Sequence, residues 1–202
     1  MKNALNLTHE NYPDPHHDTY SRTVFGFWVY LMSDFILFGA LFSTYAVLSP
    51  STFGGASPRE LFQLPFTLIQ TLILLVSSLT VGLAGASTHR KQKNQTIVLF
   101  AITFLLGIAF MGMELTEFSR LIKTGNSWDK NAFLSAYFTV VGTHGLHVIF
   151  GLLWMIVLIL PVWREGVSHV SIRRLTCLRM FWQFLNIVWV FIFSFVYLMG
   201  VA

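Results

Sequence analysis

The chain has 202 residues, of which 54% are hydrophobic and 11% are charged. Soluble domains carry about 25% charged residues, so this composition excludes an ordinary soluble globular domain and indicates a membrane protein. Lysine and arginine outnumber aspartate and glutamate by 13 to 9. Because most of these cations flank apolar segments on one side, membrane topology explains them, and no nucleic-acid partner is expected.

Five apolar segments are long enough to cross a bilayer. About 20 apolar residues span the roughly 30 Å hydrocarbon layer, and the gaps between charged residues locate such segments. The predicted transmembrane helices, in chain order, are residues 25–48, 66–87, 96–118, 133–160 and 180–200. The sequence therefore predicts an all-α membrane bundle in residues 25–202, preceded by a polar N-terminal tail of residues 1–24.

Lysine and arginine positions predict the orientation of this bundle. Those on the N-terminal side of the membrane are Lys2, Arg22, Arg90, Lys91, Lys93, Arg164, Arg173, Arg174 and Arg179. Those on the other side are Arg59, Arg120, Lys123 and Lys130. Because positive residues concentrate in cytoplasmic loops, we expect a cytoplasmic N-terminus and a periplasmic C-terminus. No cleavable signal is expected, so the first helix would direct insertion.

The first span contains a single acid, Asp34. It lies about nine residues into the helix, or about 13 Å from the cytoplasmic edge at about 1.5 Å per residue. A charge at that depth costs on the order of 3 kcal/mol, so Asp34 is a candidate functional residue. Its possible roles are a proton relay, a group in a lipid cleft, and a protonated carboxyl bonded to another helix. The relay is disfavoured because no other acid lies in the inner half.

The third span ends with Glu114, Glu117 and Arg120 at three-residue spacing. This spacing places them on one helix face, where they can pair locally as the helix leaves the membrane.

The fourth span carries His144 and His147 within the sequence GTHGLHVIFG. A haem held by two histidines needs them on opposite sides of the porphyrin, normally from two helices, whereas these project from one. Zinc or copper needs three or four converging ligands, and only Glu114 is expected at the depth of His144. We therefore predict no metal site. The favoured interpretation is a hydrogen bond or ion pair from a histidine to Glu114 or Glu117, which would join the third and fourth spans.

The fifth span contains Asn186 at about the depth of Asp34, which makes it a candidate hydrogen-bond partner. No glycine-rich phosphate loop, CxxC pair or nucleophile elbow occurs in the sequence. Residue chemistry alone therefore indicates a bundle without a catalytic centre of its own.

Four segments taken together resemble subunit III of the haem-copper terminal oxidases. They are FGFWVYLMSDFILFGALFSTYAVL, GIAFMGMELTEF, FLSAYFTVVGTHGLHVIFGLLWM and FWQFLNIVWVFIFSFVYLMG. The likeness extends from about Phe25 onward and is greatest to the five-helix subunit III of cytochrome bo-type ubiquinol oxidases. Larger members of the family have two further helices, for which this chain lacks room.

The resemblance implies a non-catalytic subunit of a proton-pumping ubiquinol oxidase in the bacterial cytoplasmic membrane. Two haems, copper and ubiquinone would belong to other subunits of the complex, and this chain would hold none of them. The implied partners are the catalytic subunit I, further oxidase subunits and membrane phospholipid.

The resemblance also implies roles for individual residues. Asp34 matches the family's membrane-buried carboxylate, which is associated with a lipid-filled cleft and with sustained proton uptake by the catalytic subunit. His144 and His147 match histidines of the packed, lipid-associated interior, and Glu117 matches an acid that precedes an aromatic residue. Where many relatives have W-H-F-x-D-x-V-W in the last helix, this chain has neutral amides, Asn186 among them, which favours hydrogen bonding there.

Arg22 and Arg164 are candidate contacts for lipid phosphates at the inner surface. The alternatives left open are subunit III of a cytochrome c oxidase, a small transporter that uses Asp34 for proton coupling, and a cytochrome b-like anchor with its own haem. The absence of paired broken helices argues against a transporter. The electron donor, the haem type and the lipid are not encoded in this chain.

Overall fold

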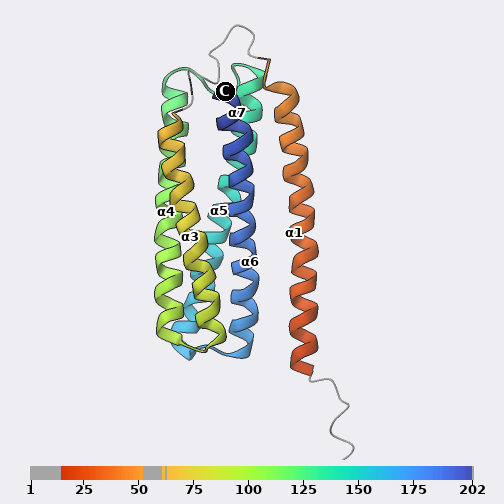
Figure 1. Cartoon of the computed structure of the whole chain (residues 1–202), viewed down its shortest axis with the longest axis vertical. Helices are drawn as coiled ribbons and strands as arrows, with labels where there is room; N and C mark the ends of the chain where they lie inside the picture. Colours follow the sequence, from red (N-terminus) through yellow and green to blue (C-terminus); the bar gives the residue numbers. More distant parts are fainter. Residues whose placement is uncertain (1–14, 52–60, 62, 202) are drawn as a thin grey trace, which may run out of the picture.

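The computed structural model describes residues 15–51, 61 and 63–201, and within these ranges the chain is entirely helical apart from turns. Five long helices run alternately up and down (Figure 1). With the labels of that figure, they are α1 (Pro15–Leu48), α3 (Leu64–His89), α4 (Lys93–Lys123), α5 (Ala132–Glu165) and α6 (His169–Ile192). A π-helix, η1 (Phe193–Leu198), and a last turn, α7 (Met199–Val201), continue α6. All five long helices suffice to cross a membrane, which confirms the predicted number of spans.

The helices extend beyond the predicted apolar spans because polar residues form their first and last turns. The Asn131 side chain accepts a hydrogen bond from the Leu134 amide at 2.7 Å and so caps the start of α5. Ser168 accepts from the Ser171 amide at 3.2 Å and caps α6, which therefore begins eleven residues before position 180. Residues 15–24 of the predicted polar tail are helical, while residues 1–14 lie outside the described part of the chain.

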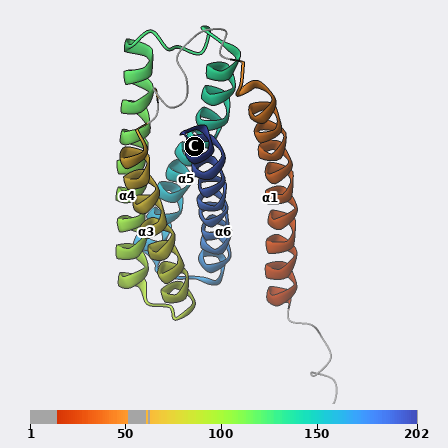
Figure 2. The same cartoon turned by 45° about the horizontal axis from the view of Figure 1, so that its top comes forward.

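Helix α6 lies at the centre of the bundle and α1 at its edge. Helices α3, α4, α5 and α6 pack together, whereas α1 contacts α5 and α6 (Figures 1 and 2). In the most apolar part of each helix, 56% of α6 is buried but only 17% of α1. The α1 helix therefore presents most of its surface to its surroundings.

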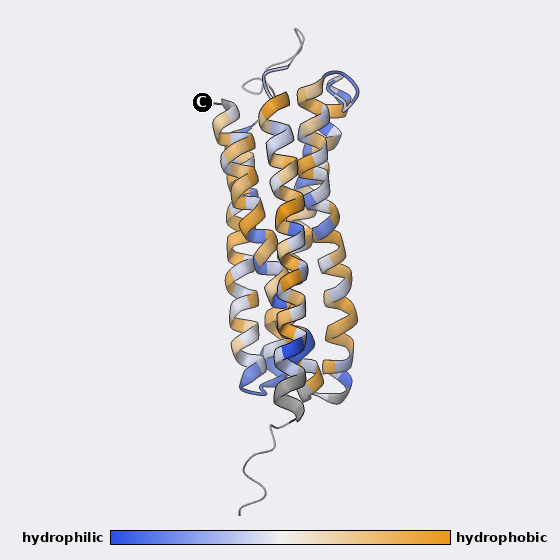
Figure 3. Ribbon diagram, turned by 90° about the vertical axis from the view of Figure 1, so that its right-hand side faces the viewer, coloured by the Kyte–Doolittle hydropathy of each residue, from blue (hydrophilic) through white to orange (hydrophobic). Residues whose placement is uncertain are grey.

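The surface of the bundle is apolar and its interior holds polar side chains. Leu79, Leu105 and Leu146 are more than 60% exposed, and the middle of the bundle is largely hydrophobic in Figure 3. The buried polar side chains include Asp34, Gln70, Thr71, Ser77, Thr103, Glu114, Glu117, His144 and Asn186. This distribution suits hydrocarbon, where a polar group can find hydrogen bonds only inside the protein.

Two tryptophans of α6 bind hydroxyl groups of α3. Trp182 donates its indole N–H to Ser77 Oγ at 2.8 Å, and Trp189 donates to Thr71 Oγ1 at 3.1 Å. All four side chains are buried. The two bonds lie about two helical turns apart and fix the antiparallel register of α3 against α6. Sequence analysis did not identify these pairs.

Glycine at position 107 permits close packing between α4, α5 and α6. A Cβ atom there would lie 2.8 Å from Leu152 Cδ2 and 2.8 Å from the Trp182 ring. Both distances are shorter than van der Waals contact, so only glycine fits without displacing these side chains. Gly112 in the same helix has no such neighbour within 4 Å.

We expect Gly107→Ala to lower the free energy of unfolding by about 1–3 kcal/mol, because the added methyl group overpacks the core. Gly112→Ala makes the same chemical change in open space and serves as the matched control. The measurement is equilibrium unfolding of the purified protein in mixed detergent micelles. Equal effects of the two substitutions would contradict the close-packing argument.

Candidate functional site

Asp34 faces His147 across the contact between α1 and α5. Asp34 Oδ2 lies 3.9 Å from His147 Nε2, and Asp34 is 8% exposed. His147 Nδ1 donates to the Thr143 carbonyl at 2.8 Å, so in the neutral ring Nε2 is an acceptor. At 3.9 Å the two side chains are in polar contact without a hydrogen bond, and the contact is an ion pair when His147 carries a charge. The His147 ring also packs against Phe38, with the centroids 5.3 Å apart.

Asn186 has a different partner from the one expected. Its amide nitrogen donates to the Trp182 carbonyl at 2.9 Å, one turn earlier in α6. Asp34 instead lies beside His147, whose depth is similar, and also interacts with Tyr30 one turn earlier in α1. The expected bond between Asn186 and Asp34 is therefore not formed, because axial depth does not specify which way a side chain points around its helix.

His144 joins α5 to α6. Its Nε2 donates to the Leu185 carbonyl at 3.2 Å, and its ring lies between Phe110, 5.8 Å away, and Trp189, 5.2 Å away. His144 is fully buried. The histidine bond to Glu114 or Glu117 that the sequence favoured is replaced by this backbone bond, since α6 rather than α4 supplies the nearest acceptor.

Glu117 belongs to a hydrogen-bonded chain near one end of the bundle. Tyr197 donates to Glu117 Oε2 at 3.3 Å, and the Tyr137 and Tyr197 hydroxyls lie 2.9 Å apart. Arg120 lies 4.0 Å from Glu117 Oε1, and it also donates to the Leu61 carbonyl at 3.0 Å. Tyr197 is in η1, where the wider helical turn accompanies the inward position of this tyrosine. The chain connects α4, α5 and η1.

Glu114 lies against the backbone of α5. A Cβ atom on Gly145 would be 2.6 Å from Glu114 Oε1, so the glycine leaves the space that this carboxyl group occupies. Glu114 is 2% exposed and lies next to His144 in the fold. The residue count along each span predicts Glu114 and His144 at one depth, and the structure places them so.

The two histidines of α5 do not face one centre. His147 faces α1, whereas His144 faces α4 and α6. In the described part of the chain, no three His, Cys, Asp or Glu side chains gather as they would to hold a metal ion. Arg22 near the start of α1 and Arg164 at the end of α5 are exposed at the same end of the bundle.

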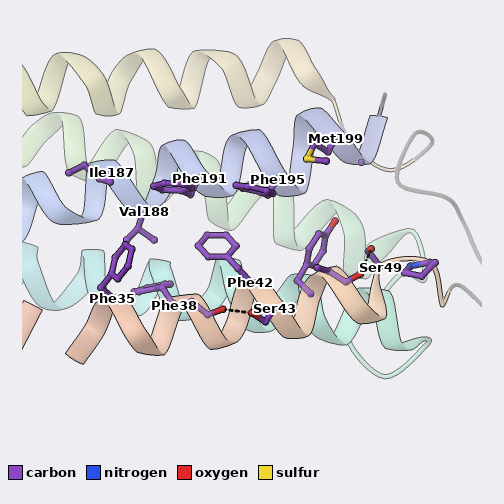
Figure 4. Close-up of a pocket in the computed structure, with 15 residues that line it drawn as sticks. Phe35, Phe38, Phe42, Ser43, Ser49, Ile187, Val188, Phe191, Phe195 and Met199 are labelled. Carbon is purple, nitrogen blue, oxygen red and sulfur yellow. Dashed lines mark hydrogen bonds between the residues drawn. The ribbon is translucent and has the colours of Figure 1, made fainter. Parts of the chain in front are cut away.

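An apolar cavity of about 690 Å³ lies between α1 and the α6–η1 segment. Phenylalanines line both sides of it (Figure 4): Phe35, Phe38 and Phe42 from α1, and Phe191 and Phe195 from α6 and η1. The Ser43 hydroxyl donates to the Gly39 carbonyl at 2.9 Å. Its hydrogen is therefore not available to a ligand in the cavity. Sequence analysis did not predict this cavity, although the phenylalanine spacing of three or four residues was a visible signal.

Fold and interior define a multi-pass membrane protein whose buried polar side chains bind one another and the backbone. Residues 7–201 match the family described as Cytochrome c oxidase subunit III, and the chain belongs to this family. Subunit III is the non-catalytic subunit of haem-copper oxidases. The predicted family is thereby confirmed, and so is the predicted location of this protein in the bacterial inner membrane.

Relatives match along nearly the whole chain. The Cytochrome bo(3) ubiquinol oxidase subunit 3 of Pseudomonas aeruginosa is 52% identical over 200 residues, which cover 99% of this chain and 95% of the relative. The protein of that name from Buchnera aphidicola subsp. Baizongia pistaciae is 43% identical, with coverage of 91% and 94%. The Cytochrome c oxidase subunit 3 of Bacillus sp. (strain PS3) is 41% identical, with coverage of 88% and 86%.

We expect the Asp34–His147 contact to stabilise α1 against α5 by about 0.6–1.7 kcal/mol, the range for polar contacts inside membrane proteins. A double-mutant cycle with Asp34→Ala and His147→Ala measures this coupling in the free energy of unfolding. Ser33→Ala combined with His147→Ala is the control, because the Ser33 hydroxyl bonds to its own helix at the Tyr30 carbonyl. Additive effects for Asp34 and His147 would show that the contact contributes nothing.

Proposed function

We propose that this chain is the third subunit of a proton-pumping ubiquinol:oxygen oxidoreductase. The observation that carries the proposal is the 52% identity, over 99% of the chain, to a protein named as a ubiquinol oxidase subunit 3. Quinol oxidation, oxygen reduction and proton pumping belong to the catalytic subunit I, which holds the haems and copper. This chain stabilises that subunit within the membrane.

A cytochrome c oxidase is the second candidate complex. The Bacillus relative named Cytochrome c oxidase subunit 3 is 41% identical to this chain, so the family serves both kinds of complex. Quinol is favoured as the donor because the ubiquinol oxidase relatives from Pseudomonas aeruginosa and Pseudomonas putida are more similar, at 52% and 46% identity.

The proposed orientation places the N-terminus in the cytoplasm and the C-terminus in the periplasm. Its support is the gathering of cations at one end of the bundle, in the first turns of α1, around the α3–α4 turn, at the end of α5 and in the first half of α6. The described cations there are Arg22, Arg90, Lys91, Lys93, Arg164, Arg173, Arg174 and Arg179. An excess of this kind marks the cytoplasmic side of bacterial membrane proteins.

The cavity between α1 and α6 is proposed to hold an acyl chain of a phospholipid. Its volume of about 690 Å³ falls within the range of about 300–1,000 Å³ typical of ligand sites, and its walls are aromatic and aliphatic. It extends to Ser49 and Met199 at the periplasmic end of the proposed orientation. Arg22 and Arg164 lie at the opposite end, so they are proposed to contact phosphates of different lipids in the inner leaflet.

Asp34 is proposed to act on this lipid site through the packing of α1. The carboxyl group does not line the cavity, but Phe38, one turn further along α1, lines it and also packs against His147. The Asp34–His147 pair therefore supports the cytoplasmic end of the cavity and helps to set its width. This arrangement supports a structural role for Asp34 rather than direct contact with lipid.

We expect affinity purification through this chain in mild detergent to recover the other oxidase polypeptides, with haem and copper in stoichiometric amount. The recovered complex should oxidise ubiquinol faster than reduced cytochrome c. Preference for cytochrome c would support the second candidate complex. A haem that stays with this polypeptide alone after subunit dissociation would contradict the proposal.

We expect Gly39→Leu to displace about one phospholipid per complex, because the new side chain would occupy the cavity. Gly39 lines the cavity and has open space around its Cα. Gly26→Leu is the matched control on the same helix, since Gly26 also has open space but does not line the cavity. The measurement is lipid phosphorus per haem after purification. Equal lipid content in both variants would overturn the proposed lipid site.

A further inference from the structure

Several fully buried polar atoms lack a hydrogen-bond partner among the described residues. Gln70 in α3 has neither its nitrogen nor its oxygen bonded, and it has no exposed surface. Glu114 Oε2, Glu117 Oε1 and His144 Nδ1 are likewise without a hydrogen-bond partner. Each of these side chains is at most 2% exposed. Buried polar groups in native proteins are normally bonded, to the protein or to ordered water.

Among them, the atoms of Gln70, Glu114 and His144 come from three helices at similar depth. The Thr80 and Thr103 hydroxyls lie 2.8 Å apart, which sets α3 against α4. Because the two helices are antiparallel, Gln70, ten residues before Thr80, is level with Met113, ten residues after Thr103. Glu114 follows Met113 and lies against Gly145, the neighbour of His144. Gln70 is one of the buried residues of α3, so the Gln70 amide group lies inside the bundle rather than facing lipid.

Helix α6 also borders this region, through Trp189. The Trp189 ring contacts His144, at 5.2 Å, and Phe110, at 4.7 Å, while its N–H bonds to Thr71 beside Gln70. Apolar walls with several unpartnered donors and acceptors are the conditions under which a protein retains internal water.

We propose that the bundle encloses a water-binding site bounded by Gln70, Glu114 and His144, with Trp189 as its wall. A water molecule forms about three hydrogen bonds, so one or two molecules match the donors and acceptors that these side chains offer. The site bridges α3, α4 and α5 through atoms that form no hydrogen bond with one another. It is distinct from the lipid cavity, whose lining includes none of these residues.

The test is X-ray radiolytic footprinting of the purified complex in water labelled with oxygen-18. Radicals made from bound water oxidise adjacent side chains even when these are sealed from solvent. We expect Trp189 to take up label at least about fivefold faster than Trp182, because only Trp189 borders the site. The two tryptophans are a matched pair: each is 1% exposed, and each donates its N–H to a hydroxyl group of α3.

Gln70→Leu should reduce the labelling of Trp189 to the level of Trp182, because it removes two of the unpartnered atoms and fills similar volume. Thr80→Val, which changes a polar contact of α3 outside the site, should leave the labelling unchanged. Equal labelling of Trp189 and Trp182 in the unaltered protein would overturn the proposal, whether or not the variants assemble. Retained labelling of Trp189 in folded Gln70→Leu would overturn the role of Gln70.

Discussion

The central constraint on this structure is that hydrocarbon offers no hydrogen bonds, so each polar side chain within the membrane must be satisfied inside the bundle. The chain meets this constraint by placing its polar residues between helices and its leucines outside. Helix α6 supplies a large share of the partners. Trp182 and Trp189 donate hydrogen bonds to α3, and the Leu185 carbonyl accepts one from His144 of α5. One central helix thereby holds its neighbours in register.

The same constraint explains what the two histidines do. Each histidine uses a ring nitrogen to donate to a backbone carbonyl, which fixes its ring orientation. His147 then presents its other nitrogen to Asp34 on α1, while His144 presents its other nitrogen to the interior near Glu114. Three residues of separation on α5 turn the two rings toward different helices. A shared metal or haem between them is incompatible with this arrangement, because their free nitrogens do not converge.

The sequence alone predicted the number and order of the helices, because runs without charge must cross the membrane. It did not predict the helix ends, which depend on caps such as Asn131 and Ser168 rather than on hydropathy. Depth along a helix could be counted, so Glu114 was expected near His144. The direction in which a side chain points around its helix could not be counted. For that reason the sequence suggested Asn186 as the partner of Asp34, whereas the structure places His147 there. The π-helix that brings Tyr197 inward has no signal in the residue pattern.

Weak packing of α1 follows from the distribution of polar contacts. In the described part of the chain, its polar links to the rest of the bundle include the Asp34–His147 pair and a long bond, 3.4 Å, from Tyr45 to the Val196 carbonyl. These links lie near the two ends of the aromatic cavity, and between them Phe42 contacts the Phe191 and Phe195 rings across it. Such contacts are non-directional and adapt to an inserted hydrocarbon chain. A peripheral helix that faces the bundle mainly through apolar contacts beside a cavity is suited to admit lipid while the other four helices stay packed.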